Sequence, residues 1–483
     1  MKKVISLALA LALLTSASIS AFADSNIINQ DSSNFCYFSV EYNAVPTYTV
    51  VIPAEVNLNT ESVSKQIKIY GADEYSKVTI DKSTSIAVGL SNSKNNLKVL
   101  NEDGNSISYT INNKSLVGEL TIVAWCDSAE KTSTDIVFTK TDELIYSGTY
   151  SDTLTFTVSL LNKIDISTIH GSYQAYNGDF LTGTANPDTH ITIADDAKVI
   201  LKDCNITAIP NDTSHKSAGI TLEGNGTLVI EGSNSVKGGY QDYPGVYVPI
   251  NKTLTIKGSG SLNASSNGEG EEALAQGAGI GGGSKINCGN ITIESGNITS
   301  TGGYRCAGIG SGYFGQCGNI VISGGNITAN GGMNSGGIGS GGYHASCGNI
   351  IISNGNVTSN GLNNGAGIGT GNEYSVCGEI EISGGVVTAT GGSYGAGIGS
   401  GKDNSSCGDI KILGGSVKAK SGQLAAAIGG GENSNCSNIT VKNSVTVVEV
   451  TKGSGAENYI GAGNSGKCNG TITIEDGSNV TKK

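Results

Sequence analysis

The stretch Cys317-Gly-Asn-Ile-Val-Ile-Ser-Gly-Gly-Asn-Ile-Thr-Ala329 decides the fold, because copies of it follow one another along the second half of the chain. Each copy holds a short apolar run, a Gly-rich corner and a second short run. A segment rich in Gly and Ala, such as Gly277-Ala-Gly-Ile-Gly281, precedes the Cys of each copy. Extended segments joined by Gly corners at a fixed period are typical of a solenoid, so the repeat is interpreted before any short motif.

Two residue types mark the period, with spacings of 29 to 32 residues. The Cys series is Cys288, Cys317, Cys347, Cys377, Cys407, Cys436 and Cys468. The Ile series is Ile280, Ile309, Ile338, Ile368, Ile398, Ile428 and Ile460. Upstream, Ile220 and Val246 take the place of the Ile, which extends the array to nine or ten coils of about 30 residues. We expect a right-handed parallel β-helix over residues 163–483, with three extended sides per coil and equivalent residues stacked.

One coil cannot bury its own inward Ile and Val side chains, but stacked coils turn them into continuous apolar ladders. Backbone hydrogen bonds between coils then pair the polar groups of every internal coil. Gly at the corners tolerates the positive φ that a tight turn needs. A propeller is disfavoured, because its units have about 40 residues and four strands.

Residues 24–162 follow a different pattern. Apolar and polar residues alternate in short runs, as in Phe38 and Val40, in Ile67 and Ile69, and through 154–160. A period of two is typical of half-buried antiparallel strands, which predicts a β-sandwich. Its two thiols, Cys36 and Cys126, form a candidate disulfide if the chain is exported.

Residues 1–23 are predicted to be a secretory signal. Lys2 and Lys3 precede an apolar run, and Ala21-Phe22-Ala23 fits a cleavage site. The apolar run is too short to span a bilayer, and no other run is long enough. The last residues contain neither a wall-sorting signal nor a hydrophobic tail. We therefore expect a secreted protein that is extracellular or held non-covalently at the cell surface.

The charge balance narrows the partners. The chain has 41 acidic and 29 basic residues, a net charge of −12, and Arg305 is its one arginine. Nucleic acid is excluded as a partner, because neutralising phosphates needs clustered Lys and Arg.

The four His residues have neither the spacing of metal ligands nor that of a catalytic triad and are interpreted as lone exposed side chains: His170, His190, His215 and His344. The Cys series has no paired metal-ligand spacing. Stacking would bring successive Cys within disulfide range, but parallel side chains point the same way and would strain the bond. The series is therefore interpreted as an inward ladder of buried thiols, from which Cys306 departs.

Four aromatic residues lie between the Ile of one side and the next Cys: Tyr313, Phe314, Tyr343 and Tyr374. Stacking of the coils predicts that they form a stripe at one corner, which is a flat apolar platform for sugar rings. Loop tips of surface proteins also collect Tyr without a ligand, so a structural role stays open. Tyr240, Tyr243 and Tyr247 form a second cluster of the same ambiguity.

Glu379 and Asp409 are both two residues past a repeat Cys and are expected to stack. Such a pair suits Ca²⁺ if the ion bridges the carboxylates, the alternative being a solvated acidic patch. A polysaccharide lyase would need to neutralise a polyuronate, for which one Arg in a net-acidic chain gives little, and a hydrolase would need two carboxylates facing one bond. Catalysis in a groove of the β-helix, or a spacer without a ligand, remains an alternative to binding.

Three segments carry a resemblance to a known family: Ala218–Val236, Tyr243–Pro249 and Leu254–Leu262. Together with the Gly-Ala-Gly-Ile-Gly coils, they are similar to β-helical carbohydrate-binding-domain proteins secreted by clostridia and related Gram-positive bacteria. The resemblance covers about two thirds of the chain and consists mostly of structural repeat residues. It implies secretion and a polysaccharide or glycan partner, and it transfers no binding residue. The expected function is non-catalytic glycan binding or adhesion.

Overall fold

The structure is a computed structural model with two compact units, residues 1–162 and 163–483. It describes residues 19–21, 35–40, 48–53, 56, 61–70, 84–91, 97–101, 103–112, 120–125, 133–142, 152–208, 217–239, 242–266 and 277–483. The predicted secretory signal lies outside these residues except for 19–21. Cys126 lies outside them too, so the predicted disulfide with Cys36 stays a prediction. Within the described part of the chain, no helix is long and apolar enough to cross a membrane.

The first unit contains two antiparallel sheets, as the alternating pattern predicted. One has the strand order β2 (Phe35–Val40), β3 (Tyr48–Pro53), β4 (Ser62–Tyr70), β9 (Ser133–Lys140), β7 (Ser106–Ile111) and β6 (Lys98–Leu100). The other pairs β1 (Ile19–Ala21), β10 (Thr155–Asp165), β5 (Thr84–Ser91) and β8 (Leu120–Trp125) in that order. The buried side chains of these strands include Ile67, Leu90, Ile136 and Phe138. The buried Tyr109 donates from its hydroxyl to Asp152, 2.9 Å away.

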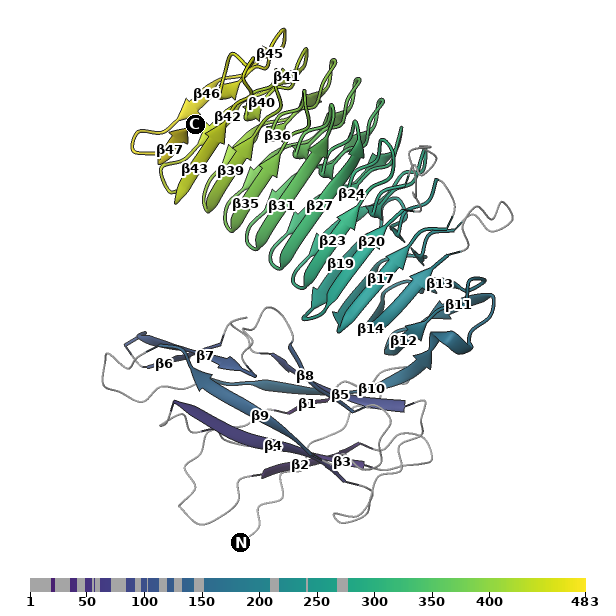
Figure 1. Ribbon diagram of the computed structural model, residues 1–483. Coiled ribbons are helices and arrows are strands. Elements are labelled where there is room, and N and C mark those ends of the chain that lie inside the picture. The colour runs from purple at the N-terminus through teal and green to yellow at the C-terminus, as the bar shows by residue number, and fades with distance from the viewer. Residues whose placement is uncertain are drawn as a thin grey trace. The chain divides into compact units, whose positions relative to one another are not determined.

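The second unit is a parallel β-helix, which confirms the predicted fold class (Figure 1). A 3₁₀ turn, η1 (Ile166–Thr168), precedes the coils. The first side comprises β12 (Asp179–Thr184), β14 (Ala197–Thr207), β16 (Gly226–Glu231), β19 (Thr253–Gly258), β22 (Asn290–Ile293), β26 (Ile320–Ile322), β30 (Ile350–Ile352), β34 (Ile380–Ile382), β38 (Ile410–Ile412), β42 (Ile439–Val441) and β46 (Ile472–Ile474). The long strand β14 continues into the second side, since it pairs with both β16 and β17.

The second and third sides complete each coil. The second side comprises β17 (Ser233–Lys237), β20 (Ser261–Ser265), β23 (Asn297–Thr301), β27 (Asn326–Met333), β31 (Asn356–Leu362), β35 (Val386–Thr390), β39 (Ser416–Lys420), β43 (Val447–Thr451) and β47 (Val480–Lys482). The third side comprises β11 (Ser172–Ala175), β13 (His190–Ile193), β15 (Ile220–Leu222), β18 (Val246–Tyr247), β21 (Ile280–Gly281), β24 (Ile309–Gly310), β28 (Ile338–Gly339), β32 (Ile368–Gly369), β36 (Ile398–Gly399), β40 (Ile428–Gly429) and β44 (Ile460–Gly461).

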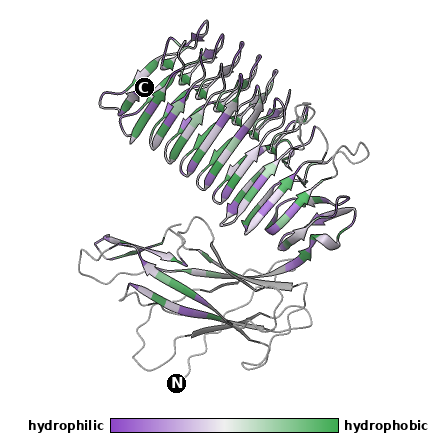
Figure 2. Ribbon diagram, in the orientation of Figure 1, coloured by the Kyte–Doolittle hydropathy of each residue, from purple (hydrophilic) through white to green (hydrophobic). Residues whose placement is uncertain are grey.

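The predicted stacking of equivalent residues is confirmed by the strand register. Ile309 pairs with Ile280 and with Ile338, and the same pairing continues coil by coil to Ile460. Ile220 and Val246 occupy this ladder upstream, as the weaker copies predicted. The hydrophobic residues line up across successive strands (Figure 2). Burial of these ladders supplies the apolar core that a single coil lacks.

The coils have a fourth side that the sequence analysis did not predict. Two-residue strands carry the repeat Cys and pair in parallel: β25 (Gln316–Cys317), β29 (Ser346–Cys347), β33 (Val376–Cys377), β37 (Ser406–Cys407), β41 (Asn435–Cys436) and β45 (Lys467–Cys468). Two residues are too short for an alternation to show in the sequence. These strands close each coil between the third-side loop and the first side.

The Gly that follows each third-side Ile is required by contact between coils. Gly339 has a φ of 131° and Gly399 one of 133°. A Cβ on Gly399 would stand 2.0 Å from the carbonyl oxygen of Gly429 on the next coil. Only Gly allows both this φ and this close stacking.

Candidate functional site

The third side is only a few residues long, so the loops before and after it lie next to each other. We call the loop that precedes the third-side strand the leading loop, such as 302–308, and the loop that follows it the trailing loop, such as 311–315. The leading loop of one coil bonds the trailing loop of the next. Gly342 donates its N–H to Arg305 O at 2.9 Å, and Lys402 donates to Asn364 O at 2.8 Å. These loops therefore form one continuous surface, the corner face, made of residues 302–316, 331–346, 361–376, 391–406 and 421–435.

The trailing loops have an unusual backbone. In four coils the Cys comes eight positions after the Ile, and the loop has one non-glycine residue with positive φ: Lys285, Phe314, Asn433 and Ser465. In three coils the Cys comes nine positions after the Ile, and the loop has two such residues: Tyr343 and His344, Glu373 and Tyr374, Asp403 and Asn404. The extra residue is thus accommodated as a second left-handed residue. Bulky side chains seldom adopt this conformation, and such strain concentrates at functional sites.

The left-handed residues hold the predicted aromatic side chains together in one cluster. Phe314 and His344 lie 6.0 Å apart with an interplanar angle of 14°, and His344 and Tyr374 lie 5.1 Å apart at 7°. We call these three rings the aromatic ladder. Phe314 is 38% exposed and Tyr374 55%. The equivalent residue of the next coil is Asn404, so the ladder ends at Tyr374.

Tyr313 and Tyr343 lie beside the ladder and nearer the coil. The Tyr313 ring is 4.5 Å from Phe314 and 5.5 Å from Tyr343, both centroid to centroid. All four predicted aromatic residues are therefore brought together. His344, which the sequence analysis interpreted as a lone exposed side chain, instead fills the gap between Phe314 and Tyr374. Its place three residues before Cys347, as Phe314 and Tyr374 are before their own Cys, is the signal that could have found it.

Arg305 extends this cluster from the leading loop. Its guanidinium carbon lies 4.3 Å from the ring centroid of Tyr343, 4.9 Å from Tyr304 and 5.4 Å from Tyr313. One terminal nitrogen, Nη1, also donates to the Tyr313 hydroxyl at 3.4 Å. Burial by itself lowers the pKa of the guanidinium, but the surrounding tyrosines raise it overall. The Arg305 guanidinium thus stays charged and makes cation–π contacts with the surrounding aromatic rings.

The corner face also holds the buried side-chain atoms that lack a hydrogen bond in the described structure. They are Arg305 Nε, Asn334 Oδ1, Asn372 Oδ1 and Glu432 Oε2. Glu432 Oε2 does have the Lys402 ammonium 3.0 Å away as an ion pair. Asn372 is only 1% exposed. Since native proteins pair nearly all such atoms, these are the places on the corner face where a water molecule or a ligand can supply the missing hydrogen bond.

The carboxylates of the corner face already have partners. Glu432 and Asp403 both contact Lys402, at 3.0 and 4.0 Å, and the Lys402 ammonium lies 4.4 Å from the Tyr394 ring centroid. Glu373 accepts from Asn372 Nδ2 at 3.1 Å, and a hydrogen bond to Glu373 raises the pKa of Tyr343. Each of these three carboxylates therefore has a polar partner on the corner face.

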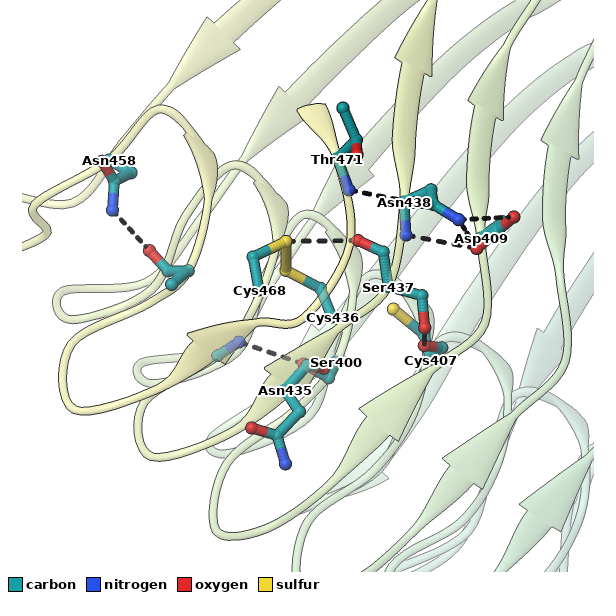
Figure 3. The surroundings of a disulfide bond; sticks show 12 residues. Ser400, Cys407, Asp409, Asn435, Cys436, Ser437, Asn438, Asn458, Cys468 and Thr471 are labelled. Carbon is teal, nitrogen blue, oxygen red and sulfur yellow. Dashed lines mark hydrogen bonds between the residues drawn. A yellow bond between two sulfur atoms is a disulfide. The ribbon is translucent and has the colours of Figure 1, made fainter. Parts of the chain in front are cut away.

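Glu379 and Asp409 do occupy equivalent positions, but both are engaged. Lys411 Nζ lies 2.7 Å from Glu379 Oε2. Asp409 Oδ1 accepts from the backbone N–H of Asn438 at 3.2 Å and from its Nδ2 at 3.0 Å (Figure 3). The described residues contain no group of three or more His, Cys, Asp or Glu that could hold a metal ion. In this structure both carboxylates therefore have a structural role, and the Ca²⁺ site at Glu379 and Asp409 stays a prediction.

Asp409 belongs to a ladder of side-chain oxygens that the sequence analysis missed. Asn290 Oδ1 accepts from the N–H of Asn319 at 2.8 Å, and Asn319 Oδ1 accepts from the N–H of Asn349 at 2.8 Å. In the same way, Asn349 Oδ1 accepts from the N–H of Glu379, and Asn438 Oδ1 accepts from the N–H of Thr471. The recurrence of Asn two residues after the repeat Cys is the signal for it. We call these residues the Asn ladder.

The repeat Cys residues form the predicted buried column. Cys347 pairs in register with Cys317 and with Cys377, and Cys377 with Cys407. Burial raises the pKa of Cys407 to about 12, so this thiol is inert at neutral pH. Cys306 is also fully buried, and its sulfur lies 3.3 Å from the backbone nitrogen of Tyr313.

The prediction of a ladder of free thiols is wrong at its last step. Cys436 and Cys468 form a disulfide between adjacent coils, with their Cα atoms 4.5 Å apart (Figure 3). The sequence argument held that parallel side chains would strain such a bridge. The short Cα separation lets two stacked Cys residues reach each other.

The second aromatic cluster is less complete. The Tyr247 hydroxyl donates to Asn287 O at 3.2 Å, and burial raises the pKa of this half-buried side chain. Tyr240 lies outside the described residues, so the cluster stays a prediction.

The stacked ladders define the class of protein: this chain is built from β-helix repeats. A family model described as "Beta helix repeat" matches residues 254–284, 291–313, 320–342, 350–372, 380–402 and 410–432. No curated protein and no solved structure matches the chain. The rings of the aromatic ladder, Phe314, His344 and Tyr374, all lie between the matched segments, so the shared repeat pattern does not account for them.

Proposed function

We propose that the chain is an exported, non-catalytic protein that binds a glycan through the aromatic ladder, at the cell surface or outside the cell. The observation that carries this proposal is the row of nearly parallel, exposed rings on left-handed backbone. An exposed aromatic ring offers a sugar ring a flat apolar face at little entropic cost, since it has only two side-chain torsions.

The end of the ladder supplies the stacking place. Tyr374 is 55% exposed, and Asn404 on the next coil leaves the ladder open beyond it. Successive coils are roughly 4.8 Å apart, so a sugar ring above Asn404 would continue the existing stack. Neighbouring sugars of an extended chain could then follow the exposed edge of the ladder.

Binding fits this site better than catalysis. A hydrolase needs two carboxylates facing one bond, and a lyase needs a basic group close to an acidic sugar. On the corner face Glu373, Asp403 and Glu432 are engaged by Asn372 and Lys402. Secretion rests on residues 1–23 and on the resemblance to clostridial carbohydrate-binding-domain proteins.

The test compares two exposed tyrosines of the same unit. A glycan array is screened with the chain, and the Kd of each hit is measured by calorimetry for Tyr374→Ala and for Tyr176→Ala. Tyr176 is 57% exposed but lies outside the corner face. Loss of one stacking contact of about 0.5–1.5 kcal/mol should weaken binding roughly 2- to 12-fold for Tyr374→Ala, with no change for Tyr176→Ala.

Other results would contradict the proposal. Equal effects of the two substitutions would move the binding site away from the ladder. Release of reducing ends or unsaturated products from any hit would identify an enzyme. The absence of every hit would favour a structural spacer.

A further inference from the structure

We infer that the glycan carries an anionic group, a carboxylate or a sulfate ester on one sugar, which binds Arg305 while another sugar of the same chain stacks on the aromatic ladder. This inference rests on the proposed function and specifies its ligand class. The evidence is the charge balance and the fixed geometry around the one arginine of the chain.

Arg305 has no anionic partner in the described structure. The ion pairs of that structure all involve Lys or His as the cation: Lys252, Lys402, Lys411, Lys442, Lys483 and His170. Among the described residues, the Arg305 guanidinium lies against the Tyr304, Tyr313 and Tyr343 rings and donates to the Tyr313 hydroxyl. Its Nε is buried without an acceptor. An unpaired guanidinium in a chain of net charge −12 is therefore the exception on this surface.

The guanidinium is also held in place before any ligand arrives. The Arg305 backbone donates to Met333 O at 3.0 Å and accepts from Gly342 N at 2.9 Å. Its φ is +61°, and tyrosine rings surround its side chain. Because little freedom remains to be lost, a rigid arginine fork binds a carboxylate or sulfate with a low entropic penalty.

Lys402 lies on the same surface and, unlike Arg305, has acidic side chains as partners. It lies against Tyr394 as Arg305 lies against Tyr343, yet Glu432 and Asp403 neutralise it. The hydrogen bond to Glu432 is the main cause that raises the pKa of Lys402. No ion pair among the described residues gives Arg305 such an acidic partner, so a ligand can supply it.

The position of Arg305 limits how many charges the ligand carries. Arg305 lies against Tyr313 and Tyr343, at the end of the cluster away from the open face of Tyr374. The carboxylates Glu373, Asp403 and Glu432 line the coils in the direction of Tyr374. A polymer with an acid on every sugar would meet these like charges. The site therefore fits a glycan whose acidic groups are sparse.

The experiment uses the full chain and matched probes. The probes are an oligosaccharide ending in one glucuronic acid, its neutral methyl ester, and the same neutral oligosaccharide with one sulfate ester. The variants are Arg305→Gln, Arg305→Lys and the control Lys402→Gln. Thermal unfolding of each variant confirms folding, and calorimetry measures Kd at low and high salt.

The wild-type chain should bind an acidic probe roughly 10-fold more tightly than the neutral ester, because charge-assisted hydrogen bonds are the stronger ones. Arg305→Gln should remove this preference, Arg305→Lys should retain part of it, and Lys402→Gln should leave it intact. The carboxylate and sulfate arms show which anion is the source. High salt should reduce the preference.

Several results would overturn the inference. If the ester binds as tightly as the acid, or if Arg305→Gln keeps the preference, the anionic contact is wrong while the glycan-binding proposal survives. If Lys402→Gln removes the preference as fully as Arg305→Gln, the contact is general surface charge. If neither acid nor ester binds while Tyr374→Ala also has no effect on any array hit, both proposals fail.

Discussion

The interior of each coil and its corner face share one 30-residue period but follow opposite rules. In the interior, the Ile of every third-side strand from β21 to β40 is fully buried, and each stacks on its own kind. On the corner face, equivalent positions hold Phe314, His344, Tyr374 and Asn404 in four successive coils. Uniformity in the first region and variety in the second show which positions the fold constrains.

The hydrogen bonds show the same difference. The Asn ladder joins neighbouring coils by bonds of 2.8–2.9 Å between Asn290 and Glu379. On the corner face, Arg305, Asn334 and Asn372 have buried atoms without such a partner. The fold tolerates these unpaired atoms because each coil is stabilised mainly by the interior ladders that join it to its neighbours. A ligand site on the corner face therefore reduces the stability of the fold less than one in the interior would.

The largest expected effect contrasts two residues of one strand. In β30, Ile350 and Ile352 are fully buried, whereas Ile351 points outward. Ile350→Ala should lower the free energy of unfolding by about 2–5 kcal/mol, because it removes buried methyl groups and leaves a cavity. Ile351→Ala should change it by less than about 0.5 kcal/mol.

Urea unfolding followed by circular dichroism measures both variants. Similar losses for the two would mean that strand β30 does not separate an inner from an outer face. Tyr374→Ala can be added to the same series, and it should behave as Ile351→Ala does, because the corner face contributes little to folding.

The fold could be predicted from the sequence because it depends on repetition. When the same apolar residue recurs at the same place in every repeat, as Ile309 and Ile338 do, all its copies can be buried only if the repeats stack in register. The short Cys strands were missed because two residues show no alternation. The disulfide of Cys436 and Cys468 was missed because stacked side chains were expected to point the same way, and the sequence does not show where two of them turn toward each other.

The site could be predicted only in part. Stacking brought Tyr313, Phe314, Tyr343 and Tyr374 together, since each has a fixed distance to the next Cys. Arg305 could not be placed, because it comes from the leading loop and its distance to the cluster depends on how the two loops bond. The acidic pair Glu379 and Asp409 was placed correctly, but its partners Lys411 and Asn438 come from the next coil.

A smaller effect should follow from adding a methyl group at the tightest contact between coils. Gly399→Ala places a Cβ 2.0 Å from Gly429 O at a φ of 133°, so the coils must separate locally. We expect a loss of about 2–3 kcal/mol in the free energy of unfolding. The control is Gly171→Ala, where φ is +77° but nothing lies within 4 Å. It should cost about 1 kcal/mol, from the backbone alone.

Both glycine variants are measured by thermal unfolding against the wild-type chain. Equal losses would show that backbone conformation, and not contact between coils, selects Gly after each third-side Ile. That result would weaken the argument that the interior is under tighter constraint than the corner.

The smallest expected effect tests the Asn ladder itself. Asn319 Oδ1 accepts from the N–H of Asn349, and its side chain is exposed, so water can replace it in part. Asn319→Ala should cost about 0.5–1.5 kcal/mol, the usual net value of one hydrogen bond. Asn319→Asp should reduce the free energy of unfolding by less, because Asp409 serves as an acceptor at the equivalent position.

Hydrogen exchange at the Asn349 amide reports on this hydrogen bond directly. The exchange should be faster in Asn319→Ala and stay slow in Asn319→Asp. Fast exchange in both would mean that the bond needs an amide side chain, and Asp409 would then need another explanation, which would reopen its role as a ligand for a cation.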